Sequence, residues 1–148
     1  MTGKECNMAE QISIPQIGAS DIGYLSFFQD IEIGFPIKRI YYTYEAPKGT
    51  KRGFHAHKKL QQLVWCPYGD ITIILDNGTS RENVRLDSPS SALFIRQGIW
   101  REMIWNRKNS VLCVAASDHY DEEDYIRDYD VFIKLVDEGF WNYERNTI

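Results

Sequence analysis

Two histidines separated by a single residue are the side chains best suited to chemistry in this sequence. They are His55 and His57, in the stretch RGFHAHKK that runs from Arg52 to Lys59. Side chains of an extended strand alternate between its two faces, so both imidazoles are predicted to point the same way, with Ala56 on the other face. Such a pair could hold a metal, move a proton, or only pack in the interior.

A metal site is disfavoured by the residues at the other ligand positions. The spacing that begins at Gly49 resembles the first motif of the cupins, which ordinarily place a metal-binding glutamate where this chain has Gln61 or Gln62. The slot of a further cupin histidine holds Arg101. A guanidinium has no lone pair to offer and keeps its charge at working pH, so it would repel a metal ion. We therefore expect no metal and no other cofactor.

Proton transfer is favoured over simple packing for this pair. Arg52, Lys58 and Arg101 are expected to surround the imidazoles, and neighbouring cations lower a histidine pKa. A neutral imidazole near neutral pH can act as a general base. The sequence therefore favours acid–base catalysis by His55 and His57, and structural packing of the two rings is the alternative.

The distribution of charge suits a small anionic ligand. The net charge of −4 gives no general attraction for nucleic acid or for an anionic membrane. Residues 38–59 nevertheless hold seven of the 17 basic residues and only one of the 21 acidic residues, Glu45. A locally basic segment in an acidic protein fits a phosphate ester. For the part from Lys48 to Lys51, a solvated loop is the favoured interpretation.

Length and composition indicate one domain with a real core. The chain has 148 residues, of which 43% are hydrophobic and 14% aromatic. It has no apolar run long enough to span a membrane, and its first residues lack the apolar stretch of a secretory signal. Cys6, Cys66 and Cys113 are odd in number and scattered, which argues against a disulfide framework. We therefore expect a cytoplasmic protein.

The segments that must position the histidines are predicted to be short strands. Asn77-Gly78 predicts a hairpin between ITIILD and NVRL, and Gln97-Gly98 predicts a second hairpin between SALFIR and IWREMIW. Many short strands separated by turns indicate an antiparallel sandwich or barrel. The other expected strands are PIKRIYYTY, FHAHK, LVWC and VLCVAAS.

The C-terminal part of the chain differs from this β body. Val131, Leu135 and Val136 have helical spacing, and Asp128 or Asp130 could cap the helix. We expect one C-terminal helix packed on the strands. His119 lies in the acidic stretch before this helix and is expected at the surface.

Longer strings carry a resemblance to one family. PIKRIYYTY, RGFHAHKKLQQLVWCPYGDITIILDNG, LDSP and ASDHYDEEDYIRDYDVF resemble the sugar-nucleotide 3,4-ketoisomerases, which are cupins that act on dTDP-4-keto-6-deoxyglucose. The resemblance covers roughly residues 12 to 140. It implies an all-β, cupin-type jelly-roll barrel with a C-terminal helix, in one domain over residues 12–148 that follows an N-terminal extension over residues 1–11.

The resemblance also implies an activity. The enzyme would move the keto group of a dTDP-linked keto-deoxysugar from C4 to C3 through an enediolate, without a metal, as a homodimer. The dTDP-3-keto-6-deoxyhexose product would pass to a separate aminotransferase that makes a 3-amino sugar for surface polysaccharide, such as lipopolysaccharide O-antigen or S-layer glycan. Arg101 stands where some relatives have histidine, and Ile22 replaces a polar or aromatic residue. Both features favour the gluco product over the galacto product.

The same resemblance assigns roles to individual residues. His55 would abstract the C3 proton, His57 would assist proton movement between oxygens, and Arg101 would hydrogen-bond the enediolate. Glu102 is expected on the opposite face and has no catalytic role. The remaining expected substrate contacts are Arg39, Arg52 and Lys58 at the diphosphate, Tyr41 at the sugar or nucleotide, and Gln61 at the ligand or a histidine. The alternative for these residues is surface charge or core packing.

Three rival functions are weighed against this one. A cupin 3,5-epimerase also abstracts α-protons, but its members usually pair a histidine with an aspartate and a tyrosine acid, and no such constellation is visible around FHAHK. A non-catalytic cupin could bind a sugar nucleotide in the same pocket without turnover. A metal-dependent dioxygenase is disfavoured by Arg101.

Overall fold

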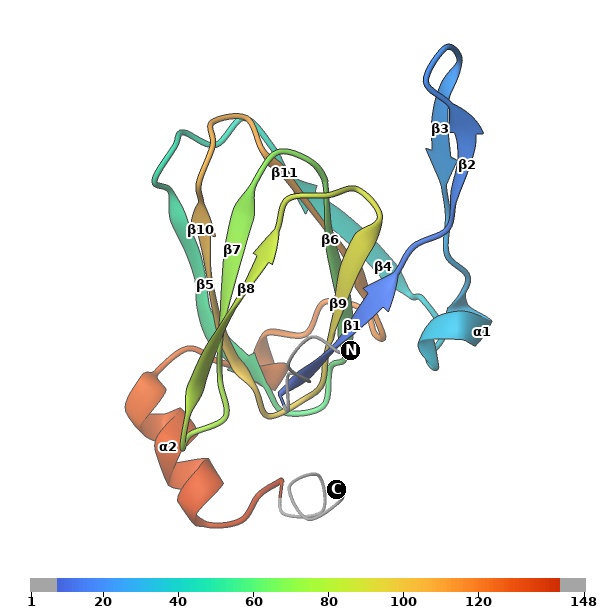
Figure 1. The fold of residues 1–148 in the computed structure, drawn as a ribbon. Helices are drawn as coiled ribbons and strands as arrows, with labels where there is room; N and C mark the ends of the chain where they lie inside the picture. Colours follow the sequence, from blue (N-terminus) through green and yellow to red (C-terminus); the bar gives the residue numbers. More distant parts are fainter. Residues whose placement is uncertain (1–7, 142–148) are drawn as a thin grey trace.

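The structure, a computed structural model, describes residues 8–141, which form mostly short antiparallel strands (Figure 1). In chain order the elements are β1 Ala9–Ser13, β2 Gln16–Ala19, β3 Gly23–Ser26, α1 Asp30–Ile33, β4 Arg39–Thr43, β5 Lys51–His57, β6 Gln62–Tyr68, β7 Ile71–Asp76, β8 Arg81–Leu86, β9 Ser91–Ile95, β10 Trp100–Trp105, β11 Val111–Ala116, the 3-10 turn η1 Glu122–Asp124, β12 Tyr125–Ile126 and α2 Tyr129–Asp137.

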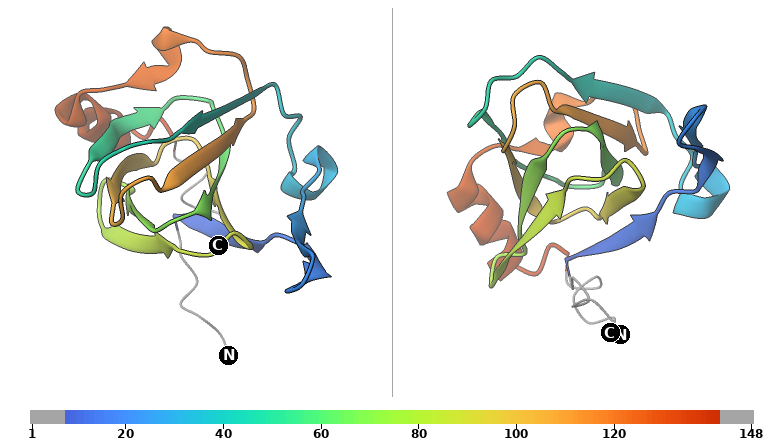
Figure 2. Two further views of the ribbon diagram at one scale, coloured as in Figure 1. Left: turned by 90° about the horizontal axis from the view of Figure 1, so that it is seen from above. Right: turned by 45° about the horizontal axis from the view of Figure 1, so that its top comes forward.

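Two five-stranded sheets close around an apolar interior (Figure 2). The first sheet has the order β1-β9-β6-β11-β4 and the second β12-β5-β10-β7-β8. Inward-facing residues of both sheets, among them Val64, Ile73, Leu93 and Trp105, form the main core cluster. Non-consecutive neighbours in each sheet are what a jelly-roll barrel requires, so the predicted all-β fold is confirmed.

One of the two predicted hairpins is confirmed and the other is wrong. β7 and β8 pair from Asp76 opposite Arg81, and the side chain of Asn77 accepts three bonds that shape the turn. β9 and β10 do not pair, because β9 lies between β1 and β6 whereas β10 lies between β5 and β7. The Gln97-Gly98 turn therefore carries the chain from one sheet to the other. A local turn signal does not say which strand becomes the neighbour.

The C-terminal helix covers the outer face of the second sheet. Asp128 caps α2 by accepting bonds from the backbone N–H groups of Asp130 and Val131, as predicted. Phe132 is the fully buried residue of the helix and packs with Trp100 and Trp141. Val131, one of the three apolar residues whose spacing predicted the helix, is 48% exposed. Within residues 8–141 no helix has the length and apolar character needed to cross a membrane.

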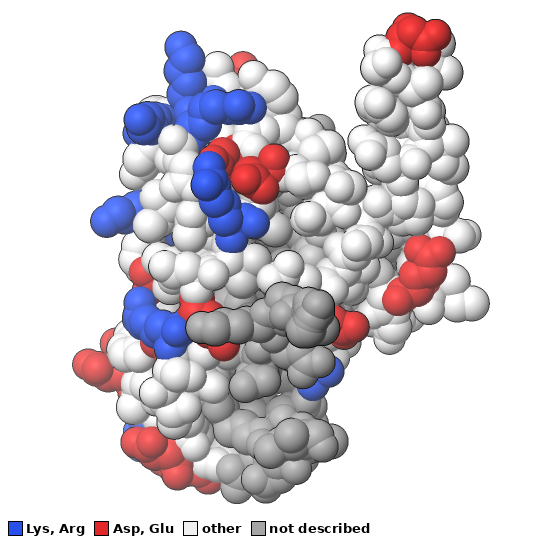
Figure 3. Space-filling model, viewed as in Figure 1, with Lys and Arg blue, Asp and Glu red and all other residues white. Residues whose placement is uncertain are grey.

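Of the N-terminal strands, β1 joins the barrel, whereas β2 and β3 form a separate hairpin. β1 pairs with β9 along its whole length, so this sheet begins at Ala9, before the boundary expected at residue 12. The β2–β3 hairpin then projects away from the barrel beside α1 (Figures 1 and 2). In the view of Figure 3, Lys and Arg gather over the upper ends of the barrel strands, whereas the hairpin is mostly uncharged with acid at its tip.

Candidate active site

A β-bulge in β5 decides which side chains of that strand enter the barrel. In the pairing of β10 with β5, Arg101 lies opposite His55 but Glu102 lies opposite Gly53, so Phe54 is the additional residue. Gly53 and Phe54 have φ values of 91° and 57°, in the left-handed region. A bulge shifts the side-chain alternation by one position. Arg52, on the far side of it, therefore lines the same cavity as His55.

Gly53 is required at this bulge for a second reason. A Cβ at this position would lie 2.7 Å from Met103 Sδ and 2.9 Å from the Arg101 carbonyl oxygen. The strand could accommodate a side chain only by moving away from β10. The close approach of β5 and β10 therefore depends on this glycine.

The two histidines occupy the barrel interior as a neighbouring pair. The centroids of the His55 and His57 rings lie 4.9 Å apart, and the exposed fractions are 8% and 0%. Burial, followed by the charge of Arg101, lowers the pKa of His55 to about 3. Burial also lowers the pKa of His57 to about 4, although a hydrogen bond to Asp124 opposes the shift. Both rings are therefore neutral at neutral pH, mainly because they are buried and less because cations lie nearby.

Arg101 is a fully buried cation facing this pair. Its Nε and Nη2 donate to the Ile99 carbonyl at 3.2 and 3.0 Å, and its Nη1 donates to Gln62 Oε1. Burial lowers the pKa of Arg101 to about 10, which leaves it charged at neutral pH. No carboxylate of residues 8–141 forms an ion pair with it. The guanidinium thus keeps donors and an uncompensated charge beside the histidines.

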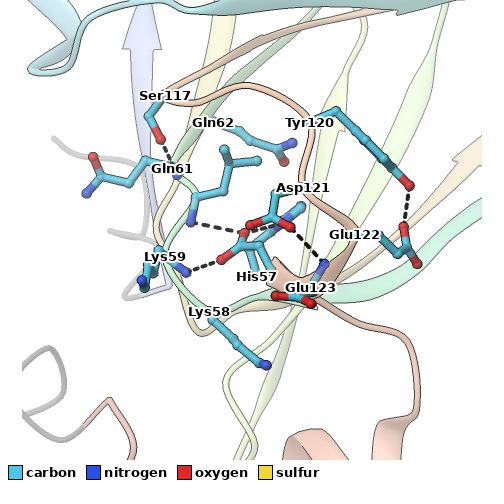
Figure 4. Close-up of polar contacts among 12 residues, drawn as sticks. His57, Lys58, Lys59, Gln61, Gln62, Ser117, Tyr120, Asp121, Glu122 and Glu123 are labelled. Atoms are coloured by element: carbon cyan, nitrogen blue, oxygen red, sulfur yellow. Dashed lines mark hydrogen bonds and ion pairs between the residues drawn. The ribbon is translucent and has the colours of Figure 1, made fainter.

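Gln62 takes the place near the histidines that the sequence assigned to Gln61. Gln62 is buried, and its Nε2 donates to the Tyr41 hydroxyl at 3.1 Å while its oxygen accepts from Arg101. Gln61 instead donates its backbone N–H to Ser117 (Figure 4), and its side chain bonds to Gln97. The sequence pattern could have identified Gln62, because it lies on the same face of β6 as the inward-facing residue Val64.

An aspartate and a tyrosine far along the chain complete the arrangement. His57 Nδ1 lies 3.0 Å from Asp124 Oδ2, and the Tyr125 ring lies 4.5 Å from the His57 ring. β12 brings them there by pairing Tyr125 with His57 and Ile126 with Ala56. A histidine with an aspartate and a tyrosine is therefore present, although it was not visible around FHAHK. The two residues lie in the string YDEEDYIR, which the sequence interpretation used only as a family marker.

A cavity of 320 Å³ opens onto His55. Its walls include Arg39, Tyr41 and Arg52, three of the expected substrate contacts, together with Tyr120, Tyr125 and Arg127, which the sequence interpretation did not assign. A smaller hollow of 130 Å³ opens beside His57 and shares Arg39 and Tyr125 with the first. The two hollows lie on either side of these shared residues.

The cations of the basic segment separate into two groups. The Arg39 guanidinium lies 5.2 Å from the Tyr41 ring centroid and 5.6 Å from that of Tyr120. Its buried Nε has no hydrogen-bond partner between residues 8 and 141. Arg52 is exposed at the cavity edge. Lys58 extends away from the His57 ring (Figure 4), and its backbone bonds to Asp124 and Trp141. Only Arg39 and Arg52 of the three therefore line the cavity.

The residues around the pair do not fit a metal ion. The Arg101 guanidinium lies where a third ligand would stand, and no cluster of three or more His, Cys, Asp or Glu side chains with metal-binding geometry occurs between residues 8 and 141. Glu102 faces outward, as predicted, and bonds to Trp100 and Arg81. His119 is exposed, also as predicted. Cys66 is buried, whereas Cys113 is only partly buried, and Cys6 lies outside the described residues.

Comparison with known proteins decides the family. A family profile described as "FdtA: WxcM-like, C-terminal" matches residues 7–137. The chain belongs to the FdtA family. The curated TDP-4-oxo-6-deoxy-alpha-D-glucose-3,4-oxoisomerase of Aneurinibacillus thermoaerophilus is 45% identical to it over 104 residues, which are 70% of this chain and 75% of the relative.

Solved structures of FdtA-like enzymes agree. The sugar 3,4-ketoisomerase QdtA from Thermoanaerobacterium thermosaccharolyticum, in complex with TDP, superposes with a TM-score of 0.85 at 38% identity, covering 90% of this chain and 97% of QdtA. A 3,4-ketoisomerase from Helicobacter canadensis superposes with a TM-score of 0.83 at 37% identity, covering 87% and 97%. The expected resemblance to 3,4-ketoisomerases and the cupin-type fold are thus confirmed.

Proposed function

We propose that this FdtA-family protein is an isomerase that moves the keto group of TDP-4-keto-6-deoxyglucose from C4 to C3. The observation that carries the proposal is the pair of buried, neutral imidazoles beside the buried guanidinium of Arg101, with a cavity that opens onto His55. This combination supplies a base for a proton α to a carbonyl and a cation for the oxyanion that develops. The activities of the matched relatives support the same conclusion.

His55 is the group that abstracts the C3 proton. It faces the 320 Å³ cavity, and neither of its ring nitrogens has a hydrogen-bond partner among the residues that the structure describes. Its low pKa keeps the lone pair available, while the substrate carbonyl and Arg101 make the C3 proton more acidic. Return of the proton to C4 completes the transfer. The reaction needs no redox partner, because C3 is oxidised as C4 is reduced within one molecule.

Arg101 stabilises the enediolate. The enediolate supplies a negative partner for this buried cation. Charge-assisted hydrogen bonds are strong in an interior from which water is excluded. Tyr41 accepts a hydrogen bond from Gln62, so its own hydroxyl proton is free to bind a sugar oxygen. Gln62 therefore orients both Arg101 and Tyr41 toward the substrate.

The nucleotide diphosphate binds at the outer end of the cavity. Arg39 and Arg52 line this end, and their charges match a diphosphate. Lys58 supplies at most long-range charge, because its side chain extends away from the ring of His57. The TDP held by QdtA supports thymidine as the nucleoside. The gluco product is favoured by arginine at position 101, and the 3-keto sugar would then serve an aminotransferase that makes a 3-amino sugar for surface polysaccharide.

The protein acts as a homodimer in this proposal. The projecting hairpin exposes Ile17, Ile22, Tyr24 and Leu25 by 57–81%. An apolar patch of this kind on a soluble enzyme marks an interaction surface. A second copy of the chain is the partner that is always present. The enzyme is expected in the cytoplasm, where nucleotide sugars are made.

A sugar 3,5-epimerase is the second candidate, because His57, Asp124 and Tyr125 form the constellation that such enzymes use. Incubation with TDP-4-keto-6-deoxyglucose in D₂O separates the candidates by NMR. Formation of the 3-keto product supports the ketoisomerase, with deuterium at C4 to the extent that the abstracted proton exchanges with solvent, and deuterium at C5 supports the epimerase. Absence of both exchange and conversion would identify a non-catalytic binding protein. The C4 configuration of the product distinguishes gluco from galacto.

A further inference from the structure

Asp124 is tied to three donors, of which one is a candidate catalytic ring. Its Oδ2 faces His57 Nδ1 at 3.0 Å and accepts from the Leu60 N–H at 3.3 Å, and its Oδ1 accepts from the Lys59 N–H at 2.8 Å. The backbone N–H of Lys58 also bonds to the Asp124 carbonyl. The carboxylate therefore has one fixed orientation, set by the turn that follows β5.

These donors keep Asp124 ionised. Burial alone would raise the pKa of this carboxyl, but the bonds from His57, Lys59 and Leu60 outweigh it and lower the pKa below its ordinary value. An ionised carboxylate is only an acceptor. The proton of the 3.0 Å contact must therefore belong to His57 Nδ1. In a neutral imidazole this leaves the lone pair on Nε2.

The opposite ring nitrogen is free to react. His57 Nε2 is buried and has no hydrogen-bond partner within residues 8–141. His57 is held by Asp124, whereas neither ring nitrogen of His55 has a hydrogen-bond partner in this described part of the chain. The two imidazoles lie side by side, but only the ring of His57 is oriented by a carboxylate.

We propose that Asp124 is a positioning residue that fixes His57 as the Nδ1–H tautomer, so that Nε2 carries a proton between the sugar oxygens. The inference rests on the proposed 3,4-ketoisomerase function and deepens it. After His55 has taken the C3 proton, Nε2 accepts the proton of the C3 hydroxyl, and the imidazolium donates it to the oxygen on C4. The first oxygen becomes the new carbonyl as C4 receives its proton. Asp124 stabilises the transient imidazolium without touching the substrate.

The test compares Asp124→Asn with Asp128→Asn. Asparagine at 124 can keep the acceptor for Lys59, but its amide N–H facing His57 favours the tautomer with the proton on Nε2. We expect kcat to fall about 10²- to 10⁴-fold with little change in KM. Asp128 caps α2 away from both hollows, and asparagine is an equally good cap, so this control should keep wild-type kcat.

A second readout separates positioning from simple folding. Nitrogen-15 NMR of the wild-type protein should show the His57 proton on Nδ1, and the Asp124→Asn variant should move it to Nε2. Wild-type protein with the proton on Nε2 would overturn the inference even if the variant failed to fold, and so would a folded variant with unchanged kcat. The tautomer measurement does not depend on the proposed reaction, because absence of ketoisomerase activity in the wild-type protein would overturn the function while leaving the NMR result interpretable.

Discussion

Arg101 lies directly opposite His55 where β10 pairs with β5, so the fully buried cation and the base it faces are held by backbone hydrogen bonds of two central strands. Sites built on paired strands hold their geometry better than sites on loops. The pairing of β10 with β5 therefore fixes the position of the Arg101 backbone relative to that of His55.

Loss of the base should stop turnover. We expect His55→Asn to reduce kcat about 10²- to 10⁴-fold, because the C3 proton then has no acceptor in reach. Binding of TDP, measured by calorimetry, should stay within a few-fold of wild type, since the diphosphate contacts proposed above are Arg39 and Arg52, which also line the cavity. Retention of most of the wild-type rate would assign the base elsewhere.

The buried charge of Arg101 should serve the reaction at the expense of stability. We expect the double variant Arg101→Met with Gln62→Leu to lose at least about 10²-fold in kcat. Its free energy of unfolding in urea should equal or exceed that of wild type, by up to about 4 kcal/mol, because a buried charge and its amide partner are replaced by apolar groups.

Arg107→Met is the matched control, since this arginine is exposed and stacks on Tyr68. It should change the free energy of unfolding by no more than about 0.5 kcal/mol and leave kcat unchanged. An active and destabilised double variant would show that Arg101 is only a structural element.

The histidines should make stability depend on pH. Their pKa values fall from 6.5 to about 3 and about 4 on folding, so between those values and 6.5 the unfolded chain binds more protons than the native protein. The contribution is complete above the unfolded pKa and is lost as pH falls, at up to about 1.4 kcal/mol per pH unit for each ring. Urea unfolding at about pH 7 and about pH 5 measures this slope. The double variant His55→Asn with His57→Gln should flatten it, and an unchanged slope would refute the assignment.

The bulge glycine should tolerate no side chain. Gly53→Ala places a methyl group 2.7 Å from Met103 Sδ in a residue with φ of 91°, so we expect it to lose both stability and activity. Gly49 has a similar φ of 87° but open space around it. Gly49→Ala should cost only the backbone strain, about 1 kcal/mol, measured by thermal or urea unfolding. Equal losses in the two variants would mean that the approach of β10 to β5 has no part in the effect.

Charges on the hairpin should break the proposed dimer. Ile22 and Leu25 are 81% and 61% exposed, so Ile22→Asp with Leu25→Asp should leave the barrel folded. We expect light scattering to show a dimer for wild type and a monomer for the variant. Asp87→Asn, at an exposed site on the barrel, is the control that should remain dimeric. A wild-type monomer, or a dimer that survives both aspartates, would contradict the assignment.

Much of the fold followed from local patterns. The strand runs, the β7–β8 hairpin, the capping of α2 by Asp128 and the shared face of His55 and His57 all depend on residues close in sequence. The separation of β9 from β10 could not be predicted, because pairing across a barrel is decided by neighbours distant in the chain.

The site was predicted less completely than the fold. Simple alternation assumes an unbroken ladder, so it could not show that the bulge at Gly53 brings Arg52 to the face of His55. Nothing local to FHAHK indicates Asp124, which is 67 positions away from His57. The role of Gln62 could have been predicted. Gln62 lies two positions before the core residue Val64 and so shares its inward face, whereas Gln61 does not.

The pairing of β12 with β5 has a consequence for biosynthesis. His57 emerges from the ribosome 67 residues before the aspartate that orients it. Chains grow at about 5–20 residues per second, so the nascent polypeptide spends seconds with the barrel strands synthesised and the imidazole still without its carboxylate. The surroundings of His57 are therefore completed only after the segment carrying Asp124 and Tyr125 has been translated and β12 has paired with β5.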